Sequence, residues 1–368
     1  MAALVACAQP AGKAFDSSGT LAAVPRDPTS TEVDCAWFGD TRGDRLFFGV
    51  SAFWSAMRQN EQDPSADLAQ PGGRYLGEYD LSEGRTRFHP LGTAPSGIWD
   101  VLAHPNGRVY FTTFFDSAGI LEPDGSVTML DDAGRGLNEL APGPAGRILA
   151  SRYATDADGQ GAVVVLGEDG RVQAEFPLPN PEGFQTAAKS LAWDPVRGEI
   201  WVNTDLIAET PGRPAAHDTR ILSAGGQERA RFTQPEVQFM TFGADGTGYF
   251  AEVADGRLRL RIRPPEAAKA PLGTGRWVLL DEAFPHALDF VQEVRVGRDG
   301  EAIVTRWSGK IHIVAASGRV RSLQLPRREG DLYYTGVRAG NRVCATVCRT
   351  APDPAAEPAW VVCAPDPG

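Results

Sequence analysis

Eight polar residues occupy equivalent places in a repeated pattern, at or near the start of the first strand of the predicted units. They are Asp34, Asp100, Asn138, Glu139, Lys189, Gln238, Gln292 and Glu293. Carboxylates and amides bind hydroxyl groups, and an ammonium pairs with an anionic group. Such side chains, if they converge, form a site for a small polar ligand. A water-filled polar channel needs the same residues, so both alternatives stay open.

Side chains alternate along a strand, so we expect only one residue of each adjacent pair to face the site. Asn138 and Glu139 form one such pair, and Gln292 and Glu293 form another. The candidate ligand-binding residues are Asp100, Asn138, Glu139, Lys189, Gln238 and Gln292.

The histidines do not supply an evident general base for nucleophilic catalysis. None is expected at the start of an inner strand: His89 and His312 fall on outer strands, His104 in a turn, and His217 and His286 in proline-bearing loops. Ser190 follows Lys189, but a Ser-Lys dyad needs a spatial geometry that sequence neighbours do not provide. The sequence therefore favours binding over catalysis and predicts no catalytic residue.

Seven segments follow one template, in which an apolar strand, a turn, a second strand, a loop and two further strands succeed one another. In residues 98–130 the turns fall at 104–107 and 124–125, both with Gly and Asp or Asn. A period of about 40 to 60 residues is typical of propeller blades, which stack because each sheet has two faces to bury. We predict an all-β fold, a seven-bladed β-propeller, with six blades as the alternative.

The repeats form one predicted domain, residues 13–368, after a separate N-terminal segment at 1–12. The seventh segment lacks an outermost strand, and we expect residues 15–24 to supply it and close the ring. Three long loops, at 53–73, 205–218 and 349–358, join second and third strands. They are expected to rim the channel where the inner strands begin, either as a binding surface or as tolerated insertions.

The net charge and the length of the apolar runs indicate which classes of partner to expect. The net charge of -11 repels phosphate backbones, so we expect no nucleic-acid partner. No apolar run approaches the roughly 20 residues of a membrane-spanning helix.

The cysteines indicate an oxidising compartment. Leu4-Val5-Ala6-Cys7 resembles the lipobox of bacterial lipoproteins, in which Cys7 would carry the lipid; an ordinary N-terminal segment with a chance cysteine is the alternative. The remaining four are disulfide candidates: Cys35, Cys344, Cys348 and Cys363. Cys363 falls on the strand after Cys344 and Cys348, so a bridge to one of them is expected, and Cys35 could link the first blade to the last. We predict a location in the cell envelope, periplasmic or outer-membrane-anchored.

The repeated strand-turn-strand motif with its Asp-Pro and Asp-Gly turns resembles a β-propeller superfamily. This superfamily includes senescence-marker-protein lactonases, gluconolactonases, strictosidine synthase-like proteins and virginiamycin B lyase. For the lactonases the resemblance implies a divalent metal held by Glu, two Asn and Asp. Asn138 falls on one Asn position, but Lys189 replaces the second, Gln238 replaces the Asp and Val33 falls on the Glu position. An ammonium at a ligand position opposes a divalent cation.

The lyase branch gives a similar result. Residues 305–311 resemble its repeat, but Arg306 stands where the repeat has Glu, and its His and Glu around magnesium have no counterpart here. We therefore expect an extracytoplasmic propeller that binds a small ligand or a protein partner through its funnel and long loops, without catalysis. The alternative is a lactonase-like hydrolase or lyase with a rebuilt site. No cofactor is expected, a calcium or magnesium ion remains the alternative, and a lipid on Cys7 is the only expected membrane contact.

Overall fold

A computed structural model gives the fold. It describes residues 35–51, 75–91, 98–113, 118–130, 136–153, 160–209, 216–233, 235–267, 275–282, 289–297, 299–349 and 361–366. The segment with Cys7, the expected closing strand at 15–24, Asp34 and the loop at 53–73 lie outside these residues, as does the side chain of Cys35.

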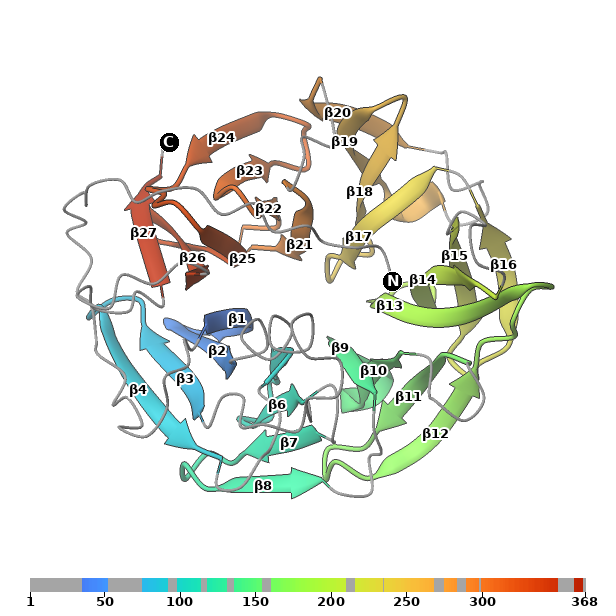
Figure 1. The fold of residues 1–368 in the computed structure, drawn as a ribbon, viewed down its shortest axis with the longest axis horizontal. Helices are drawn as coiled ribbons and strands as arrows, with labels where there is room; N and C mark the ends of the chain where they lie inside the picture. The colour runs from blue at the N-terminus through green and yellow to red at the C-terminus, as the bar shows by residue number, and fades with distance from the viewer. Residues whose placement is uncertain are drawn as a thin grey trace.

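Seven antiparallel sheets stand around a central axis, as Figure 1 shows, with the first strand of each sheet innermost. Six sheets have four strands in sequence order, and the described part of the seventh has three. The predicted seven-bladed propeller is therefore confirmed, and the six-bladed alternative is wrong.

The strands of the first four blades follow the template. Blade 1 comprises β1 (Cys35–Arg42), β2 (Arg45–Ser51), β3 (Tyr75–Asp80) and β4 (Arg85–Pro90). Blade 2 comprises β5 (Val101–Ala103), β6 (Val109–Thr112), β7 (Ala118–Leu121) and β8 (Val127–Leu130). Blade 3 comprises β9 (Leu137–Pro142), a 3-10 turn (Pro144–Gly146), β10 (Ile148–Arg152), β11 (Ala162–Leu166) and β12 (Val172–Pro177). Blade 4 comprises β13 (Phe184–Asp194), β14 (Glu199–Ala208), β15 (Ala216–Ser223) and β16 (Glu228–Phe232).

The remaining blades complete the ring. Blade 5 comprises β17 (Glu236–Phe242), β18 (Gly248–Ala254), β19 (Arg257–Arg263), a 3-10 turn (Pro265–Ala267) and β20 (Arg276–Asp281). Blade 6 comprises β21 (Val291–Val296), β22 (Ala302–Arg306), β23 (Lys310–Val314) and β24 (Val320–Gln324). Blade 7 comprises β25 (Asp331–Ala339), β26 (Arg342–Arg349) and β27 (Val361–Pro365).

Aspartates fix the tight turns that the sequence predicted. Asp124 accepts a hydrogen bond from the backbone N–H of Ser126, two residues on, and Asp245 binds that of Thr247 in the same way, each at 2.9 Å. This local bond mimics a backbone turn, and the glycine that follows each aspartate takes the positive φ. These turns join first to second and third to fourth strands, on one face of the ring that we call the turn face. The opposite face, with the second-to-third connections, is the loop face.

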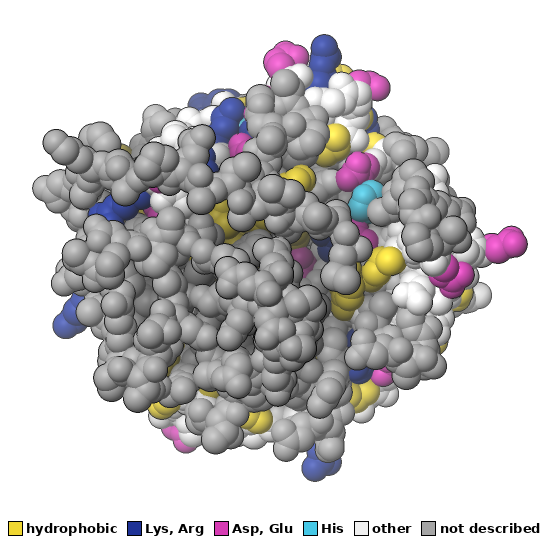
Figure 2. All heavy atoms as spheres, in the orientation of Figure 1, with side chains coloured by type: hydrophobic (Ala, Val, Ile, Leu, Met, Phe, Trp, Pro, Cys, Tyr) yellow, Lys and Arg dark blue, Asp and Glu magenta, His cyan; other side chains and the backbone are white. Residues whose placement is uncertain are grey.

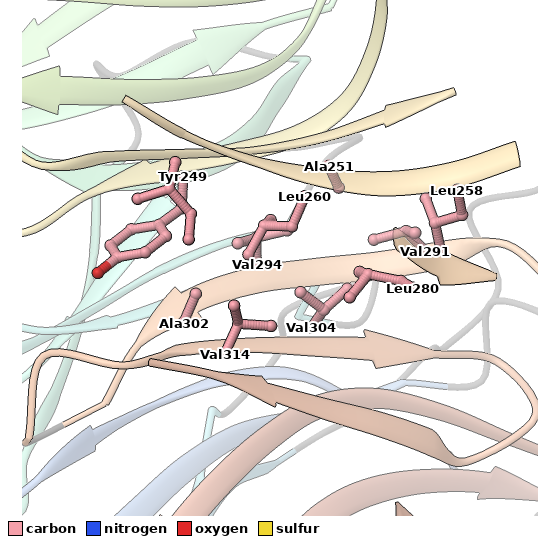
Figure 3. Close-up of a cluster of buried hydrophobic side chains, with 11 residues drawn as sticks. Tyr249, Ala251, Leu258, Leu260, Leu280, Val291, Val294, Ala302, Val304 and Val314 are labelled. Atoms are coloured by element: carbon pink, nitrogen blue, oxygen red, sulfur yellow. The ribbon is translucent and has the colours of Figure 1, made fainter. Parts of the chain in front are cut away.

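Apolar side chains fill the space between neighbouring blades. Figure 3 shows this between blades 5 and 6, where Leu258 and Leu260 of β19 lie against Val291 and Val294 of β21. Each fully buried aliphatic side chain contributes about 1.5 to 3 kcal/mol. Because both faces of a sheet are covered in this way, the sequences of the buried strands are nearly continuous runs of apolar residues.

The ring closes where blade 7 meets blade 1. Phe48 of β2 and Val337 of β25 belong to one buried cluster, and the hydroxyl of Thr335 accepts a hydrogen bond from the N–H of Gly39 at 2.9 Å. No fourth strand covers β27 in the described part of the chain. Closure by residues 15–24 therefore stays a prediction.

Blade 7 carries a disulfide between Cys344 and Cys363, which face each other on β26 and β27 with their Cα atoms 4.0 Å apart. The expected bridge from Cys363 is thus present. Cys348 is disulfide-bonded as well. Cys35, at the start of β1 beside blade 7, is its expected partner.

We predict that deletion of residues 1–24 lowers the melting temperature by several degrees, because it leaves the edge of β27 unpaired. Differential scanning calorimetry measures the change, and deletion of residues 1–12 alone serves as the control with little effect. Equal melting temperatures for the two deletions would contradict closure by this segment.

We predict that the double variant Cys344→Ala/Cys363→Ala unfolds with a free energy about 3 kcal/mol lower than the wild type, since the bridge closes a loop with a sequence separation of 19. Urea denaturation under non-reducing conditions measures the difference. An unchanged midpoint and slope would mean that the bridge does not constrain the unfolded chain.

Candidate functional site

The inner strands share one irregularity near the loop face. In blades 1, 3, 4, 5, 6 and 7, the inner strand contains one residue more than the second strand beside it, at the same level of the ring. Such a β-bulge interrupts the alternation of side chains and changes their direction. Asn138, Glu139, Lys189, Gln238 and Gln292 all lie in these bulges. The bulges thus position the polar residues that the sequence singled out.

A central cavity of about 440 Å³ lies below the bulges, with residues of all seven blades in its wall. It extends along the second half of the inner strands to Gly43, Pro105 and Gly297, which belong to or follow the first-to-second turns. The cavity therefore reaches the turn face. The expected opening of the funnel at the loop face stays a prediction, because the long loop at 53–73 lies outside the described residues.

Three of the predicted site residues line this cavity: Asp100, Glu139 and Gln292. Glu293 lines it as well, next to Gln292 at the bulge of blade 6, where the alternation of side chains is interrupted. The other three candidates lie outside the cavity wall.

Asn138 has a role in joining blades. It is buried, and its side-chain amide donates to the carbonyl of Lys189 in the next blade at 2.7 Å. Asn203 of β14 makes an equivalent contact, in which its side-chain amide donates to the carbonyl of Gln238 in blade 5 at 3.2 Å. An amide in this position satisfies a backbone carbonyl that the bulge removes from the sheet ladder.

Carboxylates join other blades at the same depth. The Asp40 Oδ2 atom accepts from the N–H of Ala103 in blade 2 at 2.9 Å, and the Asp100 Oδ2 atom accepts from the N–H of Leu140 in blade 3 at 2.7 Å. The polar end of the cavity is therefore bonded into the framework of the ring and is rigid.

Arg295 lies within this acidic group. Its guanidinium contacts the Oδ1 atom of Asp40 at 2.8 Å and the Oε1 atom of Glu293 at 3.0 Å. The second oxygen of Glu293, Oε2, is buried and has no hydrogen-bond partner among the described residues, although the carboxyl group also faces the Thr335 hydroxyl. Asp40 and Arg295 were not predicted as site residues, because they fall in ordinary strand positions of the sequence and only the ring brings them together.

Burial and mutual repulsion shift the ionisation of these carboxyl groups. Burial raises the pKa of Asp100 to about 7 and that of Glu293 to about 8, against the attraction of Arg295. Burial, with Asp100 and Glu293 nearby, raises the pKa of Glu139 well above its usual range. At neutral pH Asp100 and Glu293 are thus partly protonated and can both donate and accept hydrogen bonds.

A second polar group lies at the loop end of blades 4 and 5. The Nδ1 atom of His217 lies 2.9 Å from the Oδ1 atom of Asp205, and its Nε2 atom lies 3.7 Å from the Oε1 atom of Glu236. Hydrogen bonding to Asp205 raises the pKa of His217. Figure 2 shows a histidine near acidic side chains on this side of the ring. The sequence placed His217 in a loop, whereas β15 begins at Ala216 and brings it beside the inner strand of blade 5.

Lys189 and Gln238 belong to this loop-end group. The Lys189 ammonium lies 5.8 Å from the ring centroid of Phe239, and the Gln238 amide donates to Glu236. Neither shares the cavity with Asp100. Glu139 connects the two groups, since it lines the cavity and its carboxyl group also faces Lys189 and Asp205.

Aromatic rings fill the loop end on the opposite side. The ring centroid of Trp37 lies 5.0 Å from that of Trp99 and 4.9 Å from that of Tyr334, and Phe38 packs against the same two rings. Trp37, Phe38 and Tyr334 occupy bulge positions of blades 1 and 7. This cluster narrows the axis toward the loop face.

The described residues contain no group of three or more His, Cys, Asp or Glu side chains arranged to hold a metal ion. Asn138, the one lactonase-like ligand position, uses its amide nitrogen between blades. In the same residues, no helix is long and apolar enough to cross a membrane.

Comparison with known proteins supports the fold. No family model and no curated protein matches the chain. A solved streptogramin B lyase matches with 15% identity and a TM-score of 0.59 over 91% of this chain and 95% of that one. A catalytically inactive virginiamycin B lyase from Staphylococcus aureus with quinupristin matches with 13% identity and a TM-score of 0.59 over 89% and 95%. The calcium-binding protein regucalcin from Agrobacterium tumefaciens str. C58 is a weaker match, at 14% identity and a TM-score of 0.46 over 90% of each chain.

The likeness to the two lyase structures confirms the predicted β-propeller fold. Identities this low carry nothing about activity.

We predict that Glu293→Gln gains stability relative to the wild type as the pH rises. The pKa of Glu293 is about 8 in the folded chain and about 4.3 in the unfolded chain. The stabilising contribution of the Glu293 carboxyl group is therefore fully present below its pKa in the unfolded chain. It is lost as the pH rises through its pKa in the folded chain. Melting temperatures from about pH 4 to about pH 9 test this. The exposed Glu282→Gln is the control, and a difference as flat as that of the control would contradict the prediction.

Proposed function

We propose that this protein is a non-catalytic binding protein that holds a small organic ligand in its central cavity. The observation that carries the proposal is the cavity itself, in which an apolar wall surrounds a fixed polar end. Its volume of about 440 Å³ lies within the range of small-molecule pockets, about 300 to 1,000 Å³.

The wall suits the body of an organic molecule. Its apolar part includes Phe38, Val101, Leu140, Trp193, Phe242 and Val337. The polar end, with Asp100, Glu139, Gln292 and Glu293, would orient the ligand. Pockets of this kind gain affinity from the apolar wall and specificity from a few convergent polar groups.

The rigidity of the polar end favours binding over chemistry. Asp100 is fixed by the backbone of blade 3, and Asp40 and Glu293 hold Arg295. A preformed site binds with little cost of ordering, which raises affinity. No histidine lines the cavity within the described residues, so a general base of the usual kind is not provided there.

The alternative function is that of a hydrolase or lyase. One observation favours it, the His217–Asp205 pair beside Glu236 and near Lys189 at the loop end. A histidine held by a carboxylate is a common general base. Recovery of a bound ligand unchanged after long incubation distinguishes binding from turnover.

The disulfides support a location outside the cytoplasm. The Cys344–Cys363 bridge and the bonded Cys348 are typical of oxidising compartments. We propose the cell envelope, with Cys7 as lipid anchor. The acidic surface disfavours a nucleic-acid partner, and a protein partner on the loop face is compatible with a ligand in the cavity.

We predict that Thr241→Trp abolishes ligand binding, because Thr241 lines the cavity and an indole there fills it. Saturation-transfer NMR with a library of small organic fragments measures binding to both proteins. The control is Thr128→Trp on the outer strand β8, where the side chain is exposed. Fragments that bind both variants equally, or no fragment binding to the wild type, would contradict the proposed function.

A further inference from the structure

We infer that the ligand of the central cavity is an organic cation, an amine with an apolar body. The inference rests on the proposed function and names its ligand class.

Carboxyl groups outnumber cations in the cavity. Four of them line it: Asp40, Asp100, Glu139 and Glu293. Arg295 is the guanidinium among them, and it is shared between two of the four. Arg338 lines the cavity near the turn face, but its guanidinium is bound to Asp299, Glu301 and Asp366. In their ionised forms these carboxyl groups attract a cation and repel an anion, so the attraction grows as the pH rises through the pKa of Glu293, about 8.

One buried acceptor atom of the cavity has no hydrogen-bond partner within the described residues, the Oε2 atom of Glu293. Gln292 also lines the cavity, and its amide nitrogen donates to the carbonyl of Val291 at 3.3 Å. A buried acceptor without a partner is costly, so a ligand that donates a hydrogen bond to it is favoured. An ammonium has three donors and no acceptor.

The wall supplies the remaining part of the site. Trp193 and Phe242 line the cavity and also pack against the inter-blade core, and Phe38 lies at the bulge end of the cavity. Aromatic faces attract cations and cover the apolar part of an amine. The Lys189 ammonium near the ring of Phe239 is an example of this contact within the protein itself.

Binding of a cation would change the protonation of the carboxyl groups. Glu293 faces Arg295, Asp100, Asp40 and the Thr335 hydroxyl, and Glu139 faces Asp100, Glu293, Lys189 and Asp205. A cation favours the ionised form, so it displaces a proton as it binds. The affinity for an amine should therefore rise with pH up to about 8 and then level off.

The test uses benzylamine, benzyl alcohol and benzoate as probes of one shape and three charges. Isothermal titration calorimetry on the full chain at about pH 8 should give an affinity about tenfold or more higher for benzylamine than for benzyl alcohol, and no binding of benzoate. Titrations in buffers of different ionisation enthalpy should show proton release with benzylamine. Equal or tighter binding of the alcohol or of benzoate would overturn the ligand class while leaving the proposed function intact. Binding of none of the three would overturn both.

Glu293→Gln tests the same inference at one residue. We expect it to weaken benzylamine about tenfold, to leave benzyl alcohol nearly unchanged and to reduce proton release. Glu139→Gln should likewise weaken benzylamine binding and reduce proton release. The inference can then still be tested if one of the two variants fails to fold. The exposed Glu282→Gln is the matched control. Unchanged benzylamine affinity in both folded cavity variants would refute the inference.

Discussion

The extra residue in the inner strands is the constraint on which the centre of this propeller depends. Each bulge releases backbone groups from the sheet ladder at the same level of the ring. Those groups must find other partners, and they find them in the neighbouring blade. Asn138 binds the carbonyl of Lys189, and Thr335 binds the N–H of Gly39. The bulges thus turn a stack of separate sheets into a ring bonded at its axis.

The same irregularity shapes the chemistry of the channel. Because the bulges redirect side chains, polar and aromatic residues meet at one level, and the space below them remains as a cavity. Carboxyl groups that join blades, such as Asp100, also form the end of this cavity. Their burial costs stability when they ionise, as the raised pKa values of Asp100 and Glu293 indicate. A bound cation would relieve that cost, which is the physical link between the framework and the ligand.

The blades could be predicted from sequence, because apolar strands and Asp-Gly turns recur with a fixed period. Three of the six candidate residues, Asp100, Glu139 and Gln292, do line the cavity. The bulges could not be predicted, since one extra residue leaves the pattern of apolar residues almost unchanged. As a result, the structural role of Asn138 between blades was missed. Arg295 lies far in sequence from its partner Asp40 in blade 1, so only the closed ring brings the two together. His217 was predicted in a loop, and the structure shows it on a strand next to Glu236 of blade 5.

The most direct test of the account is a carbon-13 NMR titration of the side-chain carboxyl groups, with Asp100, Glu139 and Glu293 assigned by substitution. We predict that Glu293 is largely protonated at pH 7 in the free protein, that the pKa of Glu139 lies well above its ordinary range, and that benzylamine shifts both groups toward the ionised form. Ordinary titration of both below about pH 5, with no change when benzylamine is added, would contradict a buried acidic site built to receive a cation.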